Sequence, residues 1–523
     1  MHKDELPDDL DQLRELVLKL ASSNDQLVAT VSTQQERIEK QEHRISELLA
    51  ALRGKQRERI DPDQLLLFEI GELEKLIEEE LDQSRPKRSR KKRRSGRLIP
   101  DHLPHVEVLH ELPEQERLCP IDEKPMPAIR YEVSKQLDYV PSQMRVIVHK
   151  RAVYACPEKH DEATLITAPK PSQPIDKGLP SAGLLAQVVI GKFGDHVPGY
   201  RLEDIFSRHG VQIRRSTIYD WLSATSDLVT PLYERMKSRV LQSKVIHTDD
   251  TQVKLIDHTI GGTRLARFWA YLGDRGNRYT VYDFTQTRKR AGPEKFLQDY
   301  EGYLQADAYG GYDGIYLKSH GKIAEVACWA HCRRYWHKAR EQDPSRAHHV
   351  LGMVARLYEV ERAASEADAE TLQKLREEHS RPLLDELKSW LDAEEFLPKS
   401  LIGRAATYTR NQWGGLNRYI ADGELSIDNN RAERAMKPVA IGRKNWLFVG
   451  SAEAGRRAAR LMSLVASCKE NHVEPWAYLH AVISTLPAGA DLEALLPDRW
   501  LAENPTHRWE IADQRKEERQ AKS

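Results

Sequence analysis

The sequence predicts a multidomain α/β protein that carries an N-terminal coiled coil, and three observations support this fold class. A heptad repeat occupies the N-terminus, a dense basic run separates it from the rest, and strand-like segments begin near residue 244. At 523 residues, 40% of them hydrophobic, the chain can form roughly three to four domains. Its 80 basic and 80 acidic residues balance, but a net charge of zero does not exclude local basic surfaces.

The cysteine content and the distribution of apolar residues indicate in which cellular compartment the protein resides. Five cysteines are too few and too scattered for a disulfide framework, which favours a reducing cytosol. The first ten residues are highly charged, and no stretch of the sequence approaches the length of a membrane span. We therefore expect a cytoplasmic protein without membrane contacts.

The first segment, 1–54, has the pattern of a parallel two-stranded coiled coil. Two series of positions seven residues apart begin at Leu10 and Leu13 and are mainly aliphatic. β-Branched residues in the first series and leucines in the second favour two strands, and Asn24 would fix the register by pairing with its counterpart. We expect a dimerisation helix. A single amphipathic helix packed on the body is the alternative.

Segment 55–99 combines an acidic helix with a basic linker. Nine of the 13 residues from Arg85 to Arg97 are basic and none is acidic. Such a run cannot bury itself, and its charge would neutralise DNA phosphates without reading sequence. A solvated linker without a ligand is the alternative.

Segment 100–175 has the short strands and cysteine placement of a small, degenerate zinc-finger-like module. A structural zinc site needs four ligands, usually in two closely spaced pairs. The candidates are Cys119 with Asp122 and Cys156 with His160. Because this ligand set is uncommon, a module held by packing without zinc is the alternative.

Segment 176–240 predicts three short helices in the order of a helix-turn-helix. Ser181 caps the first, over 182–193, and the second covers 202–209 before the turn residue Gly210. The third follows at once. An ordinary three-helix subdomain is the alternative.

The third helix of a helix-turn-helix places its first residues on base edges in the major groove of DNA. Thr217 followed by Asp220 resembles a capping box near its start. The residues that would contact DNA are Arg214, Arg215, Ser216 and Tyr219.

From residue 241 the pattern changes to strands. Three meandering strands, a helix, and two further strands with a short helix between them are expected over 241–337, which is the RNase H-like α/β arrangement. An all-helical insertion, 338–422, precedes the second part of this catalytic domain, 423–485, and a C-terminal tail, 486–523. The expected strands cover 244–256, 265–272, 279–284, 303–306 and 323–330, with the helix at 293–300.

Three carboxylates fall at the catalytic positions of that arrangement. Asp249 lies in the middle of the first strand, Asp307 directly after the fourth, and Glu433 one turn inside a later helix. Such a cluster repels itself unless cations fill it, and oxygen ligands with open positions suit two Mg²⁺ or Mn²⁺ ions. Asp250 competes with Asp249, because neighbours on a strand face opposite sides and periodicity does not choose between them.

Cationic and aromatic residues near these carboxylates suit a DNA backbone and an unstacked base. Plain core packing is the alternative for the aromatic candidate Trp446, and is favoured for Leu447 and Phe448. His331 is expected to cap a helix or bind phosphate, with metal ligation as the alternative. The DNA-binding candidates of this region are Arg333, Arg334, Arg431, Arg434, Arg443, Lys444 and Trp446.

These segments resemble a known family. Over nearly its whole length the chain resembles the large DDE transposase of the insertion-sequence-sixty-six family, most specifically in its catalytic segments. The resemblance places the first catalytic aspartate on Asp249. The matching segments are 247–251 (His-Thr-Asp-Asp-Thr), 307–312 (Asp-Ala-Tyr-Gly-Gly-Tyr), 328–334 (Cys-Trp-Ala-His-Cys-Arg-Arg), 428–433 (Asp-Asn-Asn-Arg-Ala-Glu) and 442–448 (Gly-Arg-Lys-Asn-Trp-Leu-Phe).

The resemblance implies that the protein binds the terminal inverted repeats of an insertion sequence. It would cut a strand with metal-activated water and join the freed 3′-hydroxyl to target DNA. Its implied partners are double-stranded DNA at the transposon ends and the target, a second copy or a higher synaptic assembly, and small accessory proteins encoded by the same element. The protein would associate with the nucleoid when bound to DNA.

The chain departs from the family pattern at two places. Of two usual Cys-x-x-Cys pairs it keeps only Cys119 and Cys156, which argues against zinc. Asp250 stands where the family usually has Glu, and we expect it on the outer face of the strand. Two other functions remain open: a DNA-binding regulator with an inactive RNase H-like domain, and an RNase H-like nuclease acting on RNA in hybrids.

Overall fold

The computed structural model describes residues 144–150, 172–176, 178–307 and 309–509, together with the backbone of two short strands at 153–155 and 165–167. All of them belong to one of the two units into which the chain divides, residues 141–523. The predicted coiled coil, the acidic helix and basic linker, and the zinc candidates Cys119, Asp122, Cys156 and His160 lie outside the described residues. No helix within the described ranges is long and apolar enough to cross a membrane.

The segment expected to form a zinc-finger-like module contributes one antiparallel strand pair to the described residues. Strand β1 (Val153–Ala155) pairs with β2 (Leu165–Thr167), with Val153 opposite Thr167. The sequence pattern predicts a strand over 143–154, but residues 144–150 are not in a strand and β1 overlaps only the end of that stretch.

Helices precede the central sheet, as predicted. The Ser181 hydroxyl accepts a hydrogen bond from the backbone N–H of Leu184 at 3.4 Å and so caps the first helix. The predicted capping box at Thr217 is wrong, because the third helix begins one turn earlier and has Arg214 at its N-cap, without a side-chain bond. The helices are α3 (Ala182–Val189), continued by a π-helical turn (Ile190–Gly194), α4 (Gly199–Arg208), α5 (Arg215–Leu228) and α6 (Thr230–Leu241).

The central sheet has six strands among the described residues, in the order β5-β4-β3-β6-β7, with β8 also paired to β3. The first three strands form an antiparallel meander, whereas β6 and β8 run parallel to β3 and β7 runs parallel to β6. The predicted last strand is too long, because it ends at Val326 and a helix begins at Trp329. The strands are β3 (Val245–Asp257), β4 (Gly262–Leu272), β5 (Thr280–Thr285), β6 (Gly302–Gln305), β7 (Ile323–Val326) and β8 (Phe448–Val449).

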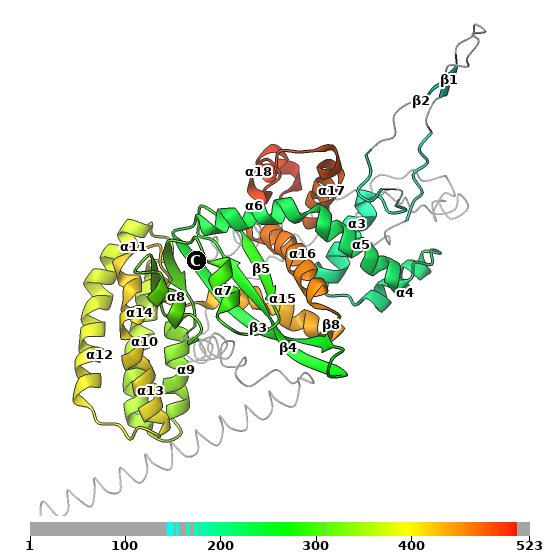
Figure 1. Ribbon diagram of the computed structural model, residues 1–523. Helices are drawn as coiled ribbons and strands as arrows, with labels where there is room; N and C mark the ends of the chain where they lie inside the picture. The colour runs from blue at the N-terminus through cyan, green and yellow to red at the C-terminus, as the bar shows by residue number, and fades with distance from the viewer. Residues whose placement is uncertain are drawn as a thin grey trace, which may run out of the picture. The chain divides into compact units, whose positions relative to one another are not determined.

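Both faces of the sheet are covered, and alternation along β4 shows how. Phe268 and Ala270 belong to a core shared with α15 (Asn430–Trp446) and α16 (Ala452–Glu470), which lie along one face (Figure 1). On the other face Tyr271 stacks on Phe296 at the end of α7 (Ala291–Phe296), with ring centroids 3.6 Å apart. Neighbouring residues of the central strands therefore face two different layers.

The region predicted as an insertion is helical. Its helices lie side by side as a bundle (Figure 1) around a core that includes Trp329, Trp336 and Leu387, and the short helix at 413–417 contacts the edge strand β7. Here α8 (Asp313–Lys318) precedes β7, and the helices that follow are α9 (Trp329–Ala339), α10 (Pro344–Ala363), α11 (Ala369–Leu375), continued by a π-helical turn (Arg376–Ser380), α12 (Arg381–Ala393), α13 (Leu401–Asn411) and α14 (Trp413–Asn417).

The last helices complete the core around α3. Helix α17 (Pro475–Thr485) packs against α3, and α18 (Pro497–Glu503) contributes Trp500 to the same core. The C-terminal segment through residue 509 is thus part of the folded body, and is not only a tail as the sequence suggested.

Candidate active site

The structure separates the two neighbouring aspartates of β3. Asp249 pairs across the sheet with Ala270, whose face is covered by α15, whereas Asp250 pairs with Trp269 on the opposite face. The strand geometry therefore points Asp249 toward the helix that carries Glu433. This ambiguity could not be resolved from periodicity.

Glu433 is held near β3 by the residue at the start of its helix. The buried side chain of Asn429 donates from Nδ2 to the backbone carbonyl of Thr248 at 2.8 Å, and its Oδ1 lies 3.2 Å from Nδ1 of His247. Asp428 and Asn429 are both capping residue types, and the sequence allows either to cap this helix. Asn429 occupies the N-cap position but makes no side-chain capping bond, because its amide is used on β3.

The segment before α15 is also hydrogen-bonded to β6, the strand that ends just before Asp307. Gln305, the last residue of β6, donates from Nε2 to the carbonyls of Ser426 at 2.6 Å and Asp428 at 3.1 Å. The backbone N–H of Asn429 donates to Sγ of Cys328 at 3.1 Å, directly before α9. The start of α15, the helix that carries Glu433, is therefore fixed by β3, by β6 and by the residue before α9.

The three carboxylates affect one another's protonation. Burial raises the pKa of Asp249 well above its usual value, and the nearby charges of Asp307 and Glu433 raise it further. Burial also raises the pKa of Asp307, although the Arg288 guanidinium opposes this shift. The pKa of Glu433 is raised by burial and by Asp428 and Asp307, against the opposing charge of Arg334.

These residues fit divalent cations by the chemistry of their donors. Mg²⁺ and Mn²⁺ prefer oxygen ligands. Buried carboxylates such as these are costly to ionise unless a cation is bound beside them. Glu433 Oε1 is buried and has no hydrogen-bond partner. Within the described ranges no three His, Cys, Asp or Glu side chains are already grouped closely enough to hold one ion, so the carboxylates would have to rotate inward.

Helix α9 brings a histidine and an arginine to the same carboxylate. His331 Nδ1 lies 3.5 Å from Glu433 Oε1 and has no hydrogen-bond partner, and Arg334 Nη2 lies 3.7 Å from the same oxygen. Burial and the charge of Arg334 lower the pKa of His331 to about 4, which leaves the ring neutral at pH 7. The predicted helix-capping role of His331 is wrong, because Cys328 is the N-cap of α9.

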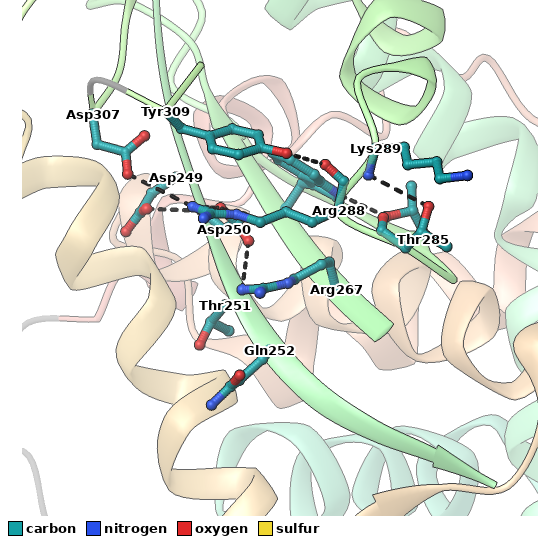
Figure 2. A network of polar contacts seen from close by, with 12 residues as sticks. Asp249, Asp250, Thr251, Gln252, Arg267, Thr285, Arg288, Lys289, Asp307 and Tyr309 are labelled. Carbon is teal, nitrogen blue, oxygen red and sulfur yellow. Dashed lines mark hydrogen bonds and ion pairs between the residues drawn. The ribbon is translucent and has the colours of Figure 1, made fainter. Parts of the chain in front are cut away.

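Asp250 is the centre of a buried ion-pair network (Figure 2). Its side chain is 1% exposed, so the expectation of an outer-face position is wrong. Arg267 donates to Oδ2 at 2.9 Å, while Nε and Nη2 of Arg288 donate to Oδ1 at 3.0 and 2.8 Å. Arg288 Nη2 also lies 3.8 Å from Oδ2 of Asp307, which links this network to one of the three candidate carboxylates.

The other cationic candidates divide into two groups. Arg431 and Arg443 make contacts within the protein, the first with the carbonyl of Gly273 and with Glu470, the second with Thr251 and the carbonyl of Gln252. Arg434 and Lys444 are exposed on α15, and Arg333 precedes Arg334 on α9.

The expectation for the aromatic segment at the end of α15 is reversed. Leu447 is 62% exposed and Phe448 47% exposed, so neither is a core residue. Trp446 instead packs against the core under α15 and lies over Nζ of Lys192, which is 5.8 Å from its ring centroid. Leu447 ends the helix with a φ of 61°, which turns the chain into β8.

The helix-turn-helix candidates lie together at the start of α5. Arg214, Arg215, Ser216 and Tyr219 are all exposed. Gly210, with a φ of 77°, makes the turn between α4 and α5, a conformation that favours glycine. The Tyr219 ring also lies 5.7 Å from Nζ of Lys192, which places this helix near α15.

Comparison with known proteins identifies the chain. Residues 177–457 match the model of the transposase IS66 family. The chain belongs to this family. Residues 116–158 match the zinc-finger binding domain of transposase IS66, and residues 463–497 match the IS66 C-terminal element. The chain is thus a transposase whose family acts on DNA and uses divalent metal. The zinc-finger match spans Cys119, Asp122 and Cys156, whereas His160 lies just beyond it.

Relatives of this IS66 transposase occur in Sinorhizobium fredii (strain NBRC 101917 / NGR234). The uncharacterized protein y4jD is 30% identical over 96% of this chain and 98% of its own length. The uncharacterized protein y4qI is 29% identical over 94% of this chain and 97% of its own length. Both alignments thus cover nearly the whole of this chain.

Sequence reasoning missed the residues that arrange this site. Arg267 and Arg288 lie on and after strands whose patterns say only which side chains are buried, and nothing local pairs them with Asp250. The one available signal was the pair of adjacent aspartates, because a second carboxylate on the covered face of a strand needs a cationic partner.

Proposed function

We propose that this IS66 protein is a DDE-type transposase with an RNase H-like catalytic domain, in which Asp249, Asp307 and Glu433 hold two Mg²⁺ or Mn²⁺ ions. The observation that carries the proposal is the bond from Asn429 to Thr248, which fixes the Glu433 helix beside Asp249. The raised pKa of each carboxylate supports it, because a cation would stabilise the ionised forms.

The chemistry of the proposal is strand cleavage and strand transfer. Two divalent ions at such carboxylates activate the attacking oxygen and stabilise the leaving oxygen of a phosphodiester. The protein's own contribution is to hold the carboxylates in place and to surround them with cations for the DNA backbone, such as Arg334 at 3.7 Å from Glu433.

DNA recognition is assigned to the helix-turn-helix. The exposed start of α5, with Arg214, Arg215, Ser216 and Tyr219, would read the terminal inverted repeats of the element in the major groove. The basic segment from Arg85 to Arg97 would add contacts to phosphates, and the N-terminal heptads would pair two copies so that both ends are held together.

A cleavage assay tests the function. The full-length protein is incubated with labelled DNA from its own locus that contains the ends of the element, with Mg²⁺ or Mn²⁺, and the cuts are mapped. We expect metal-dependent nicks at the ends, lost in Asp249→Asn and kept in Asp299→Asn, an exposed carboxylate of the same domain.

Two outcomes would contradict the assignment in different ways. Specific binding of the ends without any cut by the wild type would indicate a DNA-binding regulator. Faster cutting of RNA in an RNA–DNA hybrid than of duplex DNA would indicate an RNase H-like nuclease.

A further inference from the structure

Arg288 is the cation that joins the buried Asp250 network to Asp307, one of the three candidate carboxylates (Figure 2). The chain segments that carry Asp250 and Tyr309, the two residues that hold Arg288, also carry Asp249 and Asp307. Asp250 directly follows Asp249 on β3, and Tyr309 follows Asp307 by two residues after β6. Any residue fixed between Asp250 and Tyr309 is therefore also fixed relative to the two aspartates.

The Arg288 guanidinium is held on more than one side. Nε and Nη2 bond to Asp250, and the guanidinium carbon lies 3.8 Å from the centroid of the Tyr309 ring. The Tyr309 hydroxyl donates to the backbone carbonyl of Arg288, which ties the same residue at a second point. An arginine held by a carboxylate and stacked on an aromatic ring has lost most of its rotational freedom before any ligand arrives.

The Arg288 side chain is more exposed than that of its partner Asp250. The Asp250 side chain is 1% exposed, whereas that of Arg288 is 37% exposed. Nη1 donates to no acceptor in the part of the chain that the structure describes. One donor of a rigid cation is thus available to solvent beside Asp307.

Structural need alone does not explain this placement. Arg267 already donates to Asp250 at 2.9 Å, and one arginine suffices to neutralise one buried carboxylate. With a second arginine on the same carboxylate, the three side chains carry a net positive charge, and Arg288 places it beside Asp307.

We propose that Arg288 binds a non-bridging oxygen of the DNA phosphate that is cut, and that Asp250 and Tyr309 position it. The proposal rests on the proposed function. When water attacks phosphorus, a P–O bond forms, the bond to the 3′ oxygen breaks, and that oxygen leaves as a hydroxyl with a proton from the water. The charge on the phosphate oxygens increases in the transition state, and Arg288, which stays protonated throughout, stabilises it.

The test compares Arg288→Gln with the wild type on two substrates, using the full-length protein and Mn²⁺. One is a duplex carrying an end of the element from its own locus, and the other carries an uncharged methylphosphonate at the mapped cut. We expect Arg288→Gln to slow cutting of the ordinary duplex about 100-fold, with binding of the duplex reduced less than about tenfold. On the methylphosphonate the difference from wild type should shrink at least about tenfold, because the charge that Arg288 binds is absent.

Three further variants control the comparison. Lys289→Gln removes an exposed neighbouring cation and should leave cutting within about twofold of wild type. Arg267→Gln breaks the other bond to Asp250, so any loss it causes should be the same on both substrates. Arg288→Lys keeps the charge and should lose less than Arg288→Gln, and it replaces that variant if the latter does not fold.

Every outcome decides the matter. A wild type that does not cut removes the proposed function and this proposal with it. If the wild type cuts and Arg288→Gln cuts equally well, the function stands and the role of Arg288 is wrong. An equal loss on both substrates makes Arg288 a structural residue and also overturns the proposal, whereas a loss confined to the charged phosphate supports it.

Discussion

The side chain of Asn429 donates a hydrogen bond to the backbone carbonyl of Thr248 at 2.8 Å, one residue before Asp249. This contact joins two parts of the chain that are 181 residues apart in sequence. It places the first turn of α15, and with it Glu433, at the middle of β3.

Replacement of Asn429 by Ala should therefore affect the site more than the fold. The carbonyl of Thr248 and the Nδ1 of His247 would lose their partner in a buried position, which costs about 3 kcal/mol of unfolding free energy. Metal-dependent cutting should fall at least tenfold. Asn471→Ala is the matched control, because the buried amide of Asn471 bonds to the carbonyls of Arg278 and Ser467 at the end of α16. It should lower stability similarly and spare cutting; equal loss of cutting in both variants would remove the positioning role.

Asp249→Asn should stabilise the protein when metal is absent. The folded pKa of Asp249 is raised, so its stability contribution is present at low pH and is lost as the pH rises through that pKa. Above that pKa the amide removes a buried charge and its repulsion from Asp307. Thermal unfolding in EDTA should show a higher midpoint for the variant. Saturating Mn²⁺ should raise the midpoint of the wild type but not of the variant, by a stabilisation of about 3 kcal/mol at a hundredfold excess over Kd. A variant that is less stable than wild type without metal would contradict this.

The buried Lys192 should make stability increase with pH. Burial lowers its pKa from 10.5 to about 8, so between these two pH values the unfolded chain binds one proton more than the folded chain. The free energy of unfolding rises through that window by at most about 3 kcal/mol. Below the window the full cost of burying a charged Lys192 is present. Urea denaturation at several pH values should show this rise in the wild type and not in Lys192→Met. Lys254→Met, at an exposed lysine, controls for the loss of one charge; a rise that persists in Lys192→Met would exclude this lysine as its source.

Arg376 should be the most sensitive charged residue of the helical region. Its side chain is 1% exposed, pairs with both oxygens of Glu361, and donates to the carbonyls of Tyr419, Asp422 and Leu425. Arg376→Met should cost about 3–5 kcal/mol in chemical denaturation, because it leaves three backbone carbonyls and the largely covered carboxylate of Glu361 without their donor. The half-exposed pair of Arg381 with Glu377 is the comparison, and Arg381→Met should cost about 0.5 kcal/mol or less. Similar costs for the two variants would show that the buried network contributes little.

The strands, and the places of the candidate carboxylates relative to them, could be predicted because each leaves a local signal. Period-2 alternation marks β3 and β4, and Asp249 and Asp307 stand at definite places in and after strands. The end of β7 was misplaced because the apolar residues 327–330 continue the strand pattern, although Trp329 already begins α9. Hydrophobicity alone does not distinguish a buried strand from the first turn of a buried helix.

Contacts between distant segments left no such signal. The burial of Asp250 depends on Arg288, and the exposure of Leu447 depends on a backbone turn with positive φ. Trp446 was expected at DNA because it is aromatic and follows two cations, but its ring packs on the core beneath its own helix. Tertiary packing determines the environment of all three residues, and it cannot be predicted from the residue type alone.

Helix α15 is anchored to β3 at both ends, by Asn429 at its start and by the pairing of Val449 with Leu255 after its end. The 17 residues of the helix span about 25 Å, close to the roughly 23 Å of strand between Thr248 and Leu255. An inserted or deleted residue within this helix would break that match and rotate Glu433 by about 100° relative to one of the two anchors. We therefore expect homologues to keep the number of residues from Asp428 to Val449, whereas this match sets no such limit on the helices of 344–421.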